Sequence, residues 1–163
     1  MNPSVSSRAI RTCLIFLTLA VTSAWASDVT IVRAFTGWRE AESFKRISEY
    51  FDGKENAGGE TVLRTHADQR AGYYFLVRAA NPGAPLTATA RIEIILPSAA
   101  KTKVYTFTAD LKTGSTVLNL GLTGADWPDA KANPVAWKLE LLAADGRVLA
   151  TEKSYLWEKP GAK

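Results

Sequence analysis

Cysteine is almost absent from this sequence. The single cysteine among 163 residues is Cys13, and it lies in an apolar stretch near the N-terminus. Residues 27–163 therefore contain no thiol, which excludes a disulfide, a thiolate nucleophile and a cysteine-bound zinc from that part of the chain. A folded domain there has to be held together by core packing alone.

Histidine is equally scarce, and the only one is His66. A catalytic histidine works with a nucleophile and an orienting partner, and a metal site needs further ligands. No Gly-x-Ser-x-Gly sequence is present, and His66 lies in the polar turn at 65–68. We expect a solvated loop histidine, no enzymatic activity, no metal and no cofactor. Hydrolysis or calcium binding by loop carboxylates is left as an alternative.

The longest apolar run lies close to the N-terminus. Arg8 and Arg11 precede the apolar residues 13–21, and residues 24–26 read Ala-Trp-Ala, the small-x-small form that signal peptidase accepts. A run of about ten residues is too short to cross a bilayer, which takes about 20. We therefore expect a signal peptide over 1–26, export to the periplasm or the cell exterior, and no stable membrane span after cleavage.

The rest of the chain has no strong excess of one charge. Without Arg8 and Arg11, 18 basic residues face 16 acidic ones, and the longest basic run is the pair Lys45 and Arg46. Proteins that bind nucleic-acid phosphates carry a cluster of basic residues. Nucleic-acid binding is therefore not expected.

Short segments with strand periodicity dominate residues 27–163, a length that suits one domain. In the final hairpin, 135–157, Trp137, Leu139 and Leu141 alternate with polar residues ahead of an Asp-Gly turn. Its second half alternates poorly, which indicates either a bulge or a strand covered on both faces. The other expected strands are 29–35, 61–64, 73–79, 87–96, 103–109 and 115–122. Of these, 73–79 is expected to be central, and 87–96 is expected to pair antiparallel with 103–109.

The period changes between residues 39 and 51. Phe44, Ile47 and Phe51 fall at i, i+3 and i+7, which predicts a short amphipathic helix that ends at Gly53. Such a helix either covers an edge or end of a sheet or is recognised by a partner. We expect the covering role.

Seven or eight short strands, frequent turn signals and no strand–helix alternation predict an all-β fold, an antiparallel two-sheet sandwich with that one helix inserted. Over residues 73–157 the chain resembles the immunoglobulin-like and fibronectin-type sandwiches of exported bacterial proteins. The resemblance is architectural, because the disulfide and core tryptophan spacing of true immunoglobulin domains are missing. It implies a fold and no activity.

Trp127 suggests a binding site. It lies in the polar loop 123–134 between Asp126 and Asp129. An exposed tryptophan stacks on a sugar ring while carboxylates accept hydrogen bonds from its hydroxyls; the alternative is that the ring folds back onto the end of the sandwich. We first expect a non-catalytic accessory or adaptor module that binds an envelope protein. The second hypothesis is a carbohydrate-binding module that uses Trp127, Asp126 and Asp129.

Overall fold

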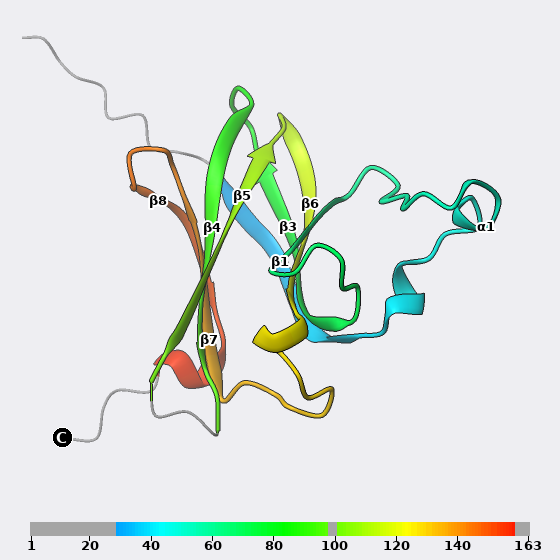
Figure 1. The fold of residues 1–163 in the computed structure, drawn as a ribbon. Coiled ribbons are helices and arrows are strands. Elements are labelled where there is room, and N and C mark those ends of the chain that lie inside the picture. The colour runs from blue at the N-terminus through cyan, green and yellow to red at the C-terminus, as the bar shows by residue number, and fades with distance from the viewer. Residues whose placement is uncertain (1–28, 98–100, 159–163) are drawn as a thin grey trace, which may run out of the picture.

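The computed structural model describes residues 29–97 and 101–158, so the expected signal peptide over 1–26 lies outside the described residues. Two four-stranded sheets pack face to face (Figure 1). Sheet A has the spatial order β1 (Thr30–Arg39), β3 (Gly72–Asn81), β6 (Gly114–Thr123) and β2 (Thr61–Arg64). Sheet B has the order β5 (Lys103–Leu111), β4 (Leu86–Ile95), β7 (Ala136–Leu142) and β8 (Val148–Lys153). The predicted all-β sandwich is confirmed.

The core lies between the sheets and is built from alternate positions of the central strands. Phe75 and Val77 of β3, Leu120 of β6, Ile92 of β4 and Leu139 of β7 are all fully buried. Because side chains alternate across a strand, the intervening residues of β3 and β6 point to the outer face of sheet A. That outer face is available to support a further segment of the chain.

The strand pairing follows the sequence pattern closely. As predicted, β3 is a central strand, and β4 pairs antiparallel with β5. β7 and β8 form the expected hairpin, with Gly146 at a φ of 82° in the turn and a register shift between Leu141 and Leu142. The uneven alternation of that last strand is therefore due to a bulge. The short strand β2 differs from the antiparallel prediction, because it runs parallel to β6.

The predicted helix over 39–51 is wrong. The segment contains only a 3-10 turn, η1 (Ala41–Phe44), and a single helical turn, α1 (Glu49–Asp52), which ends at Gly53 with a φ of 67°. Two further 3-10 turns are η2 (Gly124–Asp126) and η3 (Tyr155–Glu158). Pairing of β1 with β3 continues to Arg39, opposite Gly72, so the backbone where the helix would begin belongs to sheet A. An isolated helix of this length is marginal without packing of its apolar face, and most of that face is exposed here.

Candidate functional site

Residues 40–60 connect β1 to β2 and form what we call the projecting segment. The segment leaves the end of β1, extends away from the outer face of sheet A and returns to that sheet, so that α1 lies at its far end (Figure 1). The helix expected here was to cover an edge or end of the sandwich; the segment found in its place contacts the outer face of sheet A through Phe44, which packs on Tyr74. Two sets of contacts attach the segment to the body of the protein, and its far end is exposed.

The first attachment is aromatic and depends on a glycine of β6. Tyr74 is fully buried on the outer face of sheet A, opposite Gly121. A Cβ atom at Gly121 would lie 2.5 Å from Cε1 of Tyr74, so only glycine leaves room for that ring. The ring of Phe44 packs on Tyr74 with 4.5 Å between centroids. The Tyr74 hydroxyl donates to the carbonyl oxygen of Arg70 at 2.7 Å and accepts from Nε of Arg64 at 2.8 Å.

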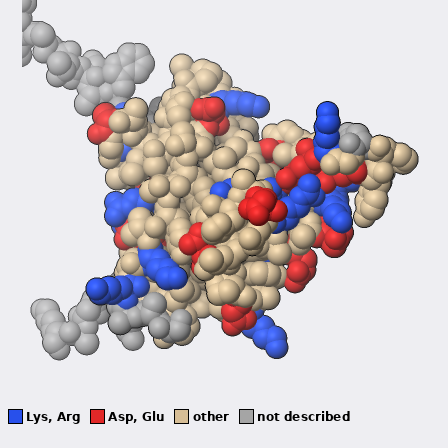
Figure 2. Space-filling view, viewed as in Figure 1, with Lys and Arg blue, Asp and Glu red and all other residues tan. Residues whose placement is uncertain are grey.

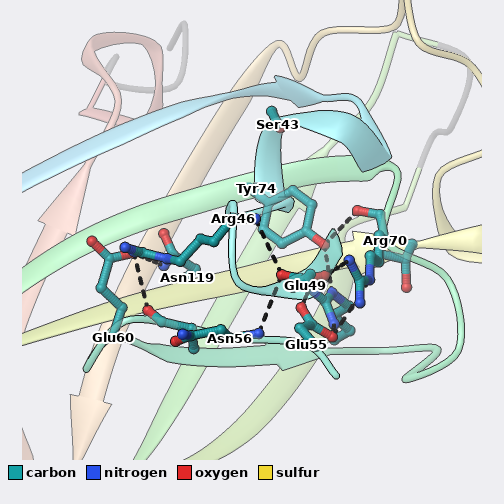
Figure 3. A network of polar contacts seen from close by, with 12 residues as sticks. Ser43, Arg46, Glu49, Glu55, Asn56, Glu60, Arg70, Tyr74 and Asn119 are labelled. Atoms are coloured by element: carbon teal, nitrogen blue, oxygen red, sulfur yellow. Dashed lines mark hydrogen bonds and ion pairs between the residues drawn. The ribbon is translucent and has the colours of Figure 1, made fainter. Parts of the chain in front are cut away.

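The second attachment consists of ion pairs that join the segment to Arg64 of β2 and to Arg70 of the loop between β2 and β3 (Figure 3). Both carboxylate oxygens of Glu55 accept hydrogen bonds from the guanidinium of Arg64. Nη1 of Arg70 lies 2.6 Å from Oε2 of Glu49, whose other oxygen accepts the backbone N–H of Asn56 at 3.2 Å. The side chains of Arg64 and Glu49 are only 6% and 7% exposed. Ion pairs shielded in this way are screened less by salt than surface pairs.

The glutamates of these ion pairs are held in their charged form at neutral pH. Hydrogen bonding from Arg64 lowers the pKa of the Glu55 carboxyl, and hydrogen bonding from Arg70 lowers the pKa of the Glu49 carboxyl. Burial raises the pKa of the Tyr74 hydroxyl, which stays a neutral donor. The network therefore holds the segment in place and does not present a titrating group suited to acid–base chemistry.

The far end of the segment exposes three large apolar side chains. Ile47, Tyr50 and Phe51 are 80%, 73% and 86% exposed, and we refer to them as the apolar tip. Figure 2 shows charged side chains crowded where the segment meets the body of the protein, while much of its outer end is uncharged. Isolated exposed apolar residues are ordinary, but three on one protruding segment make the tip a candidate interaction surface.

Of the two interpretations of Trp127, the ring that folds back onto the sandwich is confirmed, and the exposed ring that stacks on a sugar is wrong. Trp127 is 3% exposed, and its ring stacks on Tyr73 with centroids 4.4 Å apart. The chain turns back at Gly124, whose φ is 59°, and the backbone N–H of Trp127 donates to the carbonyl oxygen of Gly124 at 3.1 Å. This turn directs the ring onto the core, where its indole N–H has no partner among the described residues. A sugar ring cannot stack on Trp127 in this structure.

Of the two carboxylates predicted to accompany Trp127, Asp126 lies against a histidine of another loop and Asp129 is bonded within its own loop. Oδ2 of Asp126 lies 3.3 Å from Nε2 of His66, and Oδ1 of Asp129 accepts the backbone N–H of Lys131 at 2.8 Å. His66 lies between β2 and β3 with a partly exposed side chain, as expected of a loop histidine. With the Trp127 ring buried, Asp126 and Asp129 have no exposed tryptophan face beside them.

A cavity and a shallower depression flank the base of the projecting segment. The cavity has a volume of about 280 Å³ between the segment and sheet A, and Phe44, Leu76 and Asn119 are among its lining residues. The depression, of about 440 Å³, adjoins it and is lined in part by Phe35 and Trp38. Sequence reasoning missed both, because their walls come from four strands and a loop that no spacing connects.

Residues 29–97 and 101–158 contain no helix long and apolar enough to cross a membrane. In the same residues no group of three or more His, Cys, Asp and Glu side chains is placed to hold a metal ion. Comparison of the chain with protein-family models, with curated proteins and with solved structures found no match.

Proposed function

We propose that this protein is an exported, non-catalytic binding module of the periplasm or cell exterior, and that it binds an envelope protein through the apolar tip. The exposure of Ile47, Tyr50 and Phe51 carries the proposal. Burying such a side chain contributes about 1.5–3 kcal/mol, so three of them have the size of an interface hot spot. Because ion pairs already fix the base of the segment, less ordering entropy is lost on binding.

The charge of the projecting segment favours a protein partner over a lipid surface. Residues 40–60 contain six acidic and three basic residues. Segments that bind anionic bilayers combine apolar side chains with an excess of lysine and arginine. A net acidic segment with an apolar end instead suits a partner that has an apolar pocket with polar or basic groups around it.

The strand order supports a finer assignment of the fold as immunoglobulin-like. Immunoglobulin domains have the neighbouring strands A, B and E in one sheet. The corresponding neighbours here are β1, β3 and β6. Likewise β4, β7 and β8 match the adjacent strands C, F and G, and β5 takes the place beside C. Such a frame commonly carries binding loops, although the fold by itself transfers no activity.

Site-specific photo-crosslinking in the native host tests the proposal. A photoreactive phenylalanine analogue is placed at position 51 in the apolar tip, or at position 148 in β8, where Val148 is 50% exposed. We expect one reproducible protein adduct from position 51 that position 148 does not give. The purified partner should bind the unmodified protein and lose about tenfold or more in affinity for Tyr50→Ser and Phe51→Ser.

Two results would refute it. One is an identical adduct pattern from positions 51 and 148, which would mean that the tip has no dedicated partner. The other is co-sedimentation of the protein with anionic phospholipid vesicles that is lost in Phe51→Ser, since this would assign the tip to a membrane surface.

A further inference from the structure

The cavity beneath the projecting segment combines an apolar wall with unused positive charge. Phe44, Val62 and Leu76 form the apolar part of its lining. Arg39 and Arg46 also line it, and neither has a carboxylate oxygen within ion-pair distance among the described residues. The Arg46 guanidinium donates a hydrogen bond to the carbonyl oxygen of Ala57 at 3.3 Å.

Two neighbouring arginines pair with glutamates of the segment, which leaves Arg39 and Arg46 available to bind an anion. Arg64 and Arg70 pair with Glu55 and Glu49, so Glu55, one of the two carboxylates that line the cavity, is already neutralised. Glu60 is the remaining carboxylate of the lining, and its Oε2 accepts a hydrogen bond from Nδ2 of Asn119 at 2.7 Å. Two guanidinium groups against one uncompensated carboxylate leave the cavity with an excess of one positive charge.

We propose that this cavity binds a ligand with a single carboxylate and a small apolar body. The carboxylate pairs with Arg39 and Arg46, because a guanidinium offers planar, charge-assisted donors that match a carboxylate. The apolar body packs on Phe44, Val62 and Leu76. The volume of about 280 Å³ is close to the lower end of the range for ligand sites, so the enclosed part of the ligand is small. A doubly charged phosphate group fits less well, because Glu60 repels it.

The carboxylate has two possible sources, a free organic acid or the C-terminal end of a peptide. The adjoining depression of about 440 Å³ shares Arg39, Ser43 and Leu76 with the cavity and continues along Phe35 and Trp38. A peptide whose last residue fills the cavity would have room for its preceding residues in this depression. A free organic acid would make no use of it. Both sources share the carboxylate chemistry, and probe length distinguishes them.

The test is an NMR titration of the exported protein with N-acetyl-leucine, its C-terminal amide, and N-acetyl-alanyl-alanyl-leucine. We expect saturable shifts of the Asn119 side-chain amide with the acids, and binding of the amide that is weaker by about tenfold or more. Arg39→Gln and Arg46→Gln should each weaken the acids to a similar extent. Arg78→Gln, an exposed arginine of β3 outside the cavity lining, is the matched control and should leave binding unchanged.

The outcomes separate clearly. Tighter binding of the tripeptide by about tenfold assigns the site to a chain end, and equal binding assigns it to a free acid. The proposal is overturned if neither acid binds at about 10 mM, if the amide binds as well as the acid, or if Arg39→Gln has no effect. Phe51→Ser should bind the probes normally, so this site and the apolar tip succeed or fail separately.

Discussion

Replacing Gly121 by alanine tests how the projecting segment is attached to sheet A. The added methyl group would lie 2.5 Å from Cε1 and 2.7 Å from Cζ of Tyr74, distances that no packed structure tolerates. The Tyr74 ring must therefore move. Its movement would weaken the ring contact with Phe44 and the two hydrogen bonds of the hydroxyl group.

The size of the effect follows from these contacts. Overpacking in a well-filled site costs about 1–3 kcal/mol, and each weakened hydrogen bond adds up to about 1 kcal/mol. We expect Gly121→Ala to lower the free energy of unfolding by about 2–4 kcal/mol. At about 4 °C per kcal/mol for a domain of this size, the melting temperature falls by about 8–16 °C. Urea and thermal unfolding followed by far-ultraviolet circular dichroism measure both quantities.

Gly37→Ala is the matched control, because Gly37 lies opposite Tyr74 on the other side, in β1. A Cβ atom there would meet nothing within 4 Å, so the change should stay within about 0.5 kcal/mol. In a Tyr74→Leu background, which lacks the clashing ring atoms, Gly121→Ala should cost at least about 1 kcal/mol less than in the unmodified protein. An equal cost in both backgrounds would refute the role given to the Tyr74 ring.

The other predictions concern the core tryptophan, the ion pairs and the tip. Trp127→Ala should lower the free energy of unfolding by about 3–5 kcal/mol in urea, whereas a loss below about 1 kcal/mol would mean that the ring is exposed after all. Because the folded-state pKa of Glu55 is lowered from 4.5, its pairing stabilises the fold above that value and the stabilisation is lost as the pH falls through the lowered pKa. Unfolding of Glu55→Gln should therefore depend less on pH below about 4.5 than that of the unmodified protein, and identical profiles would contradict the pairing. Phe51→Ser should leave the melting temperature within about 2 °C, since the side chain is exposed; a larger fall would place it in contact with the body of the protein.

The strands were predictable because their signal is local. Alternation of Trp137, Leu139 and Leu141 locates β7, and bulky residues on both faces of 73–79 identify β3 as a central strand. The ends of some strands lie a few residues from their predicted positions, because cross-strand hydrogen bonding continues beyond the apolar pattern. In β1 the pairing continues to Arg39, opposite Gly72. The parallel pairing of β2 with β6 had no local signal, because it is set by where the projecting segment returns.

The helix prediction was wrong because a periodic pattern states which residues share a face but not whether anything covers that face. Phe44 packs on Tyr74, whereas Ile47 and Phe51 are exposed. The three residues of the predicted apolar face therefore do not share one buried surface. Trp127 shows the converse case. Its polar neighbours indicated exposure, but the turn at Gly124 places the ring on Tyr73. Both outcomes depend on tertiary placement, which composition does not encode.

The attachment of the segment explains how a chain without a disulfide in its folded part can present a fixed apolar tip. Its contacts join residues 9 and 21 positions apart, Glu55 with Arg64 and Glu49 with Arg70, and thus close the segment onto β2 and the loop after it, where a disulfide would otherwise serve. The same pairing withdraws Glu49 and Glu55 from Arg39 and Arg46, so fixing the segment also leaves the cavity its positive charge. The network that positions the tip therefore also sets the charge of the cavity beneath it, so the two proposed sites share one structural support.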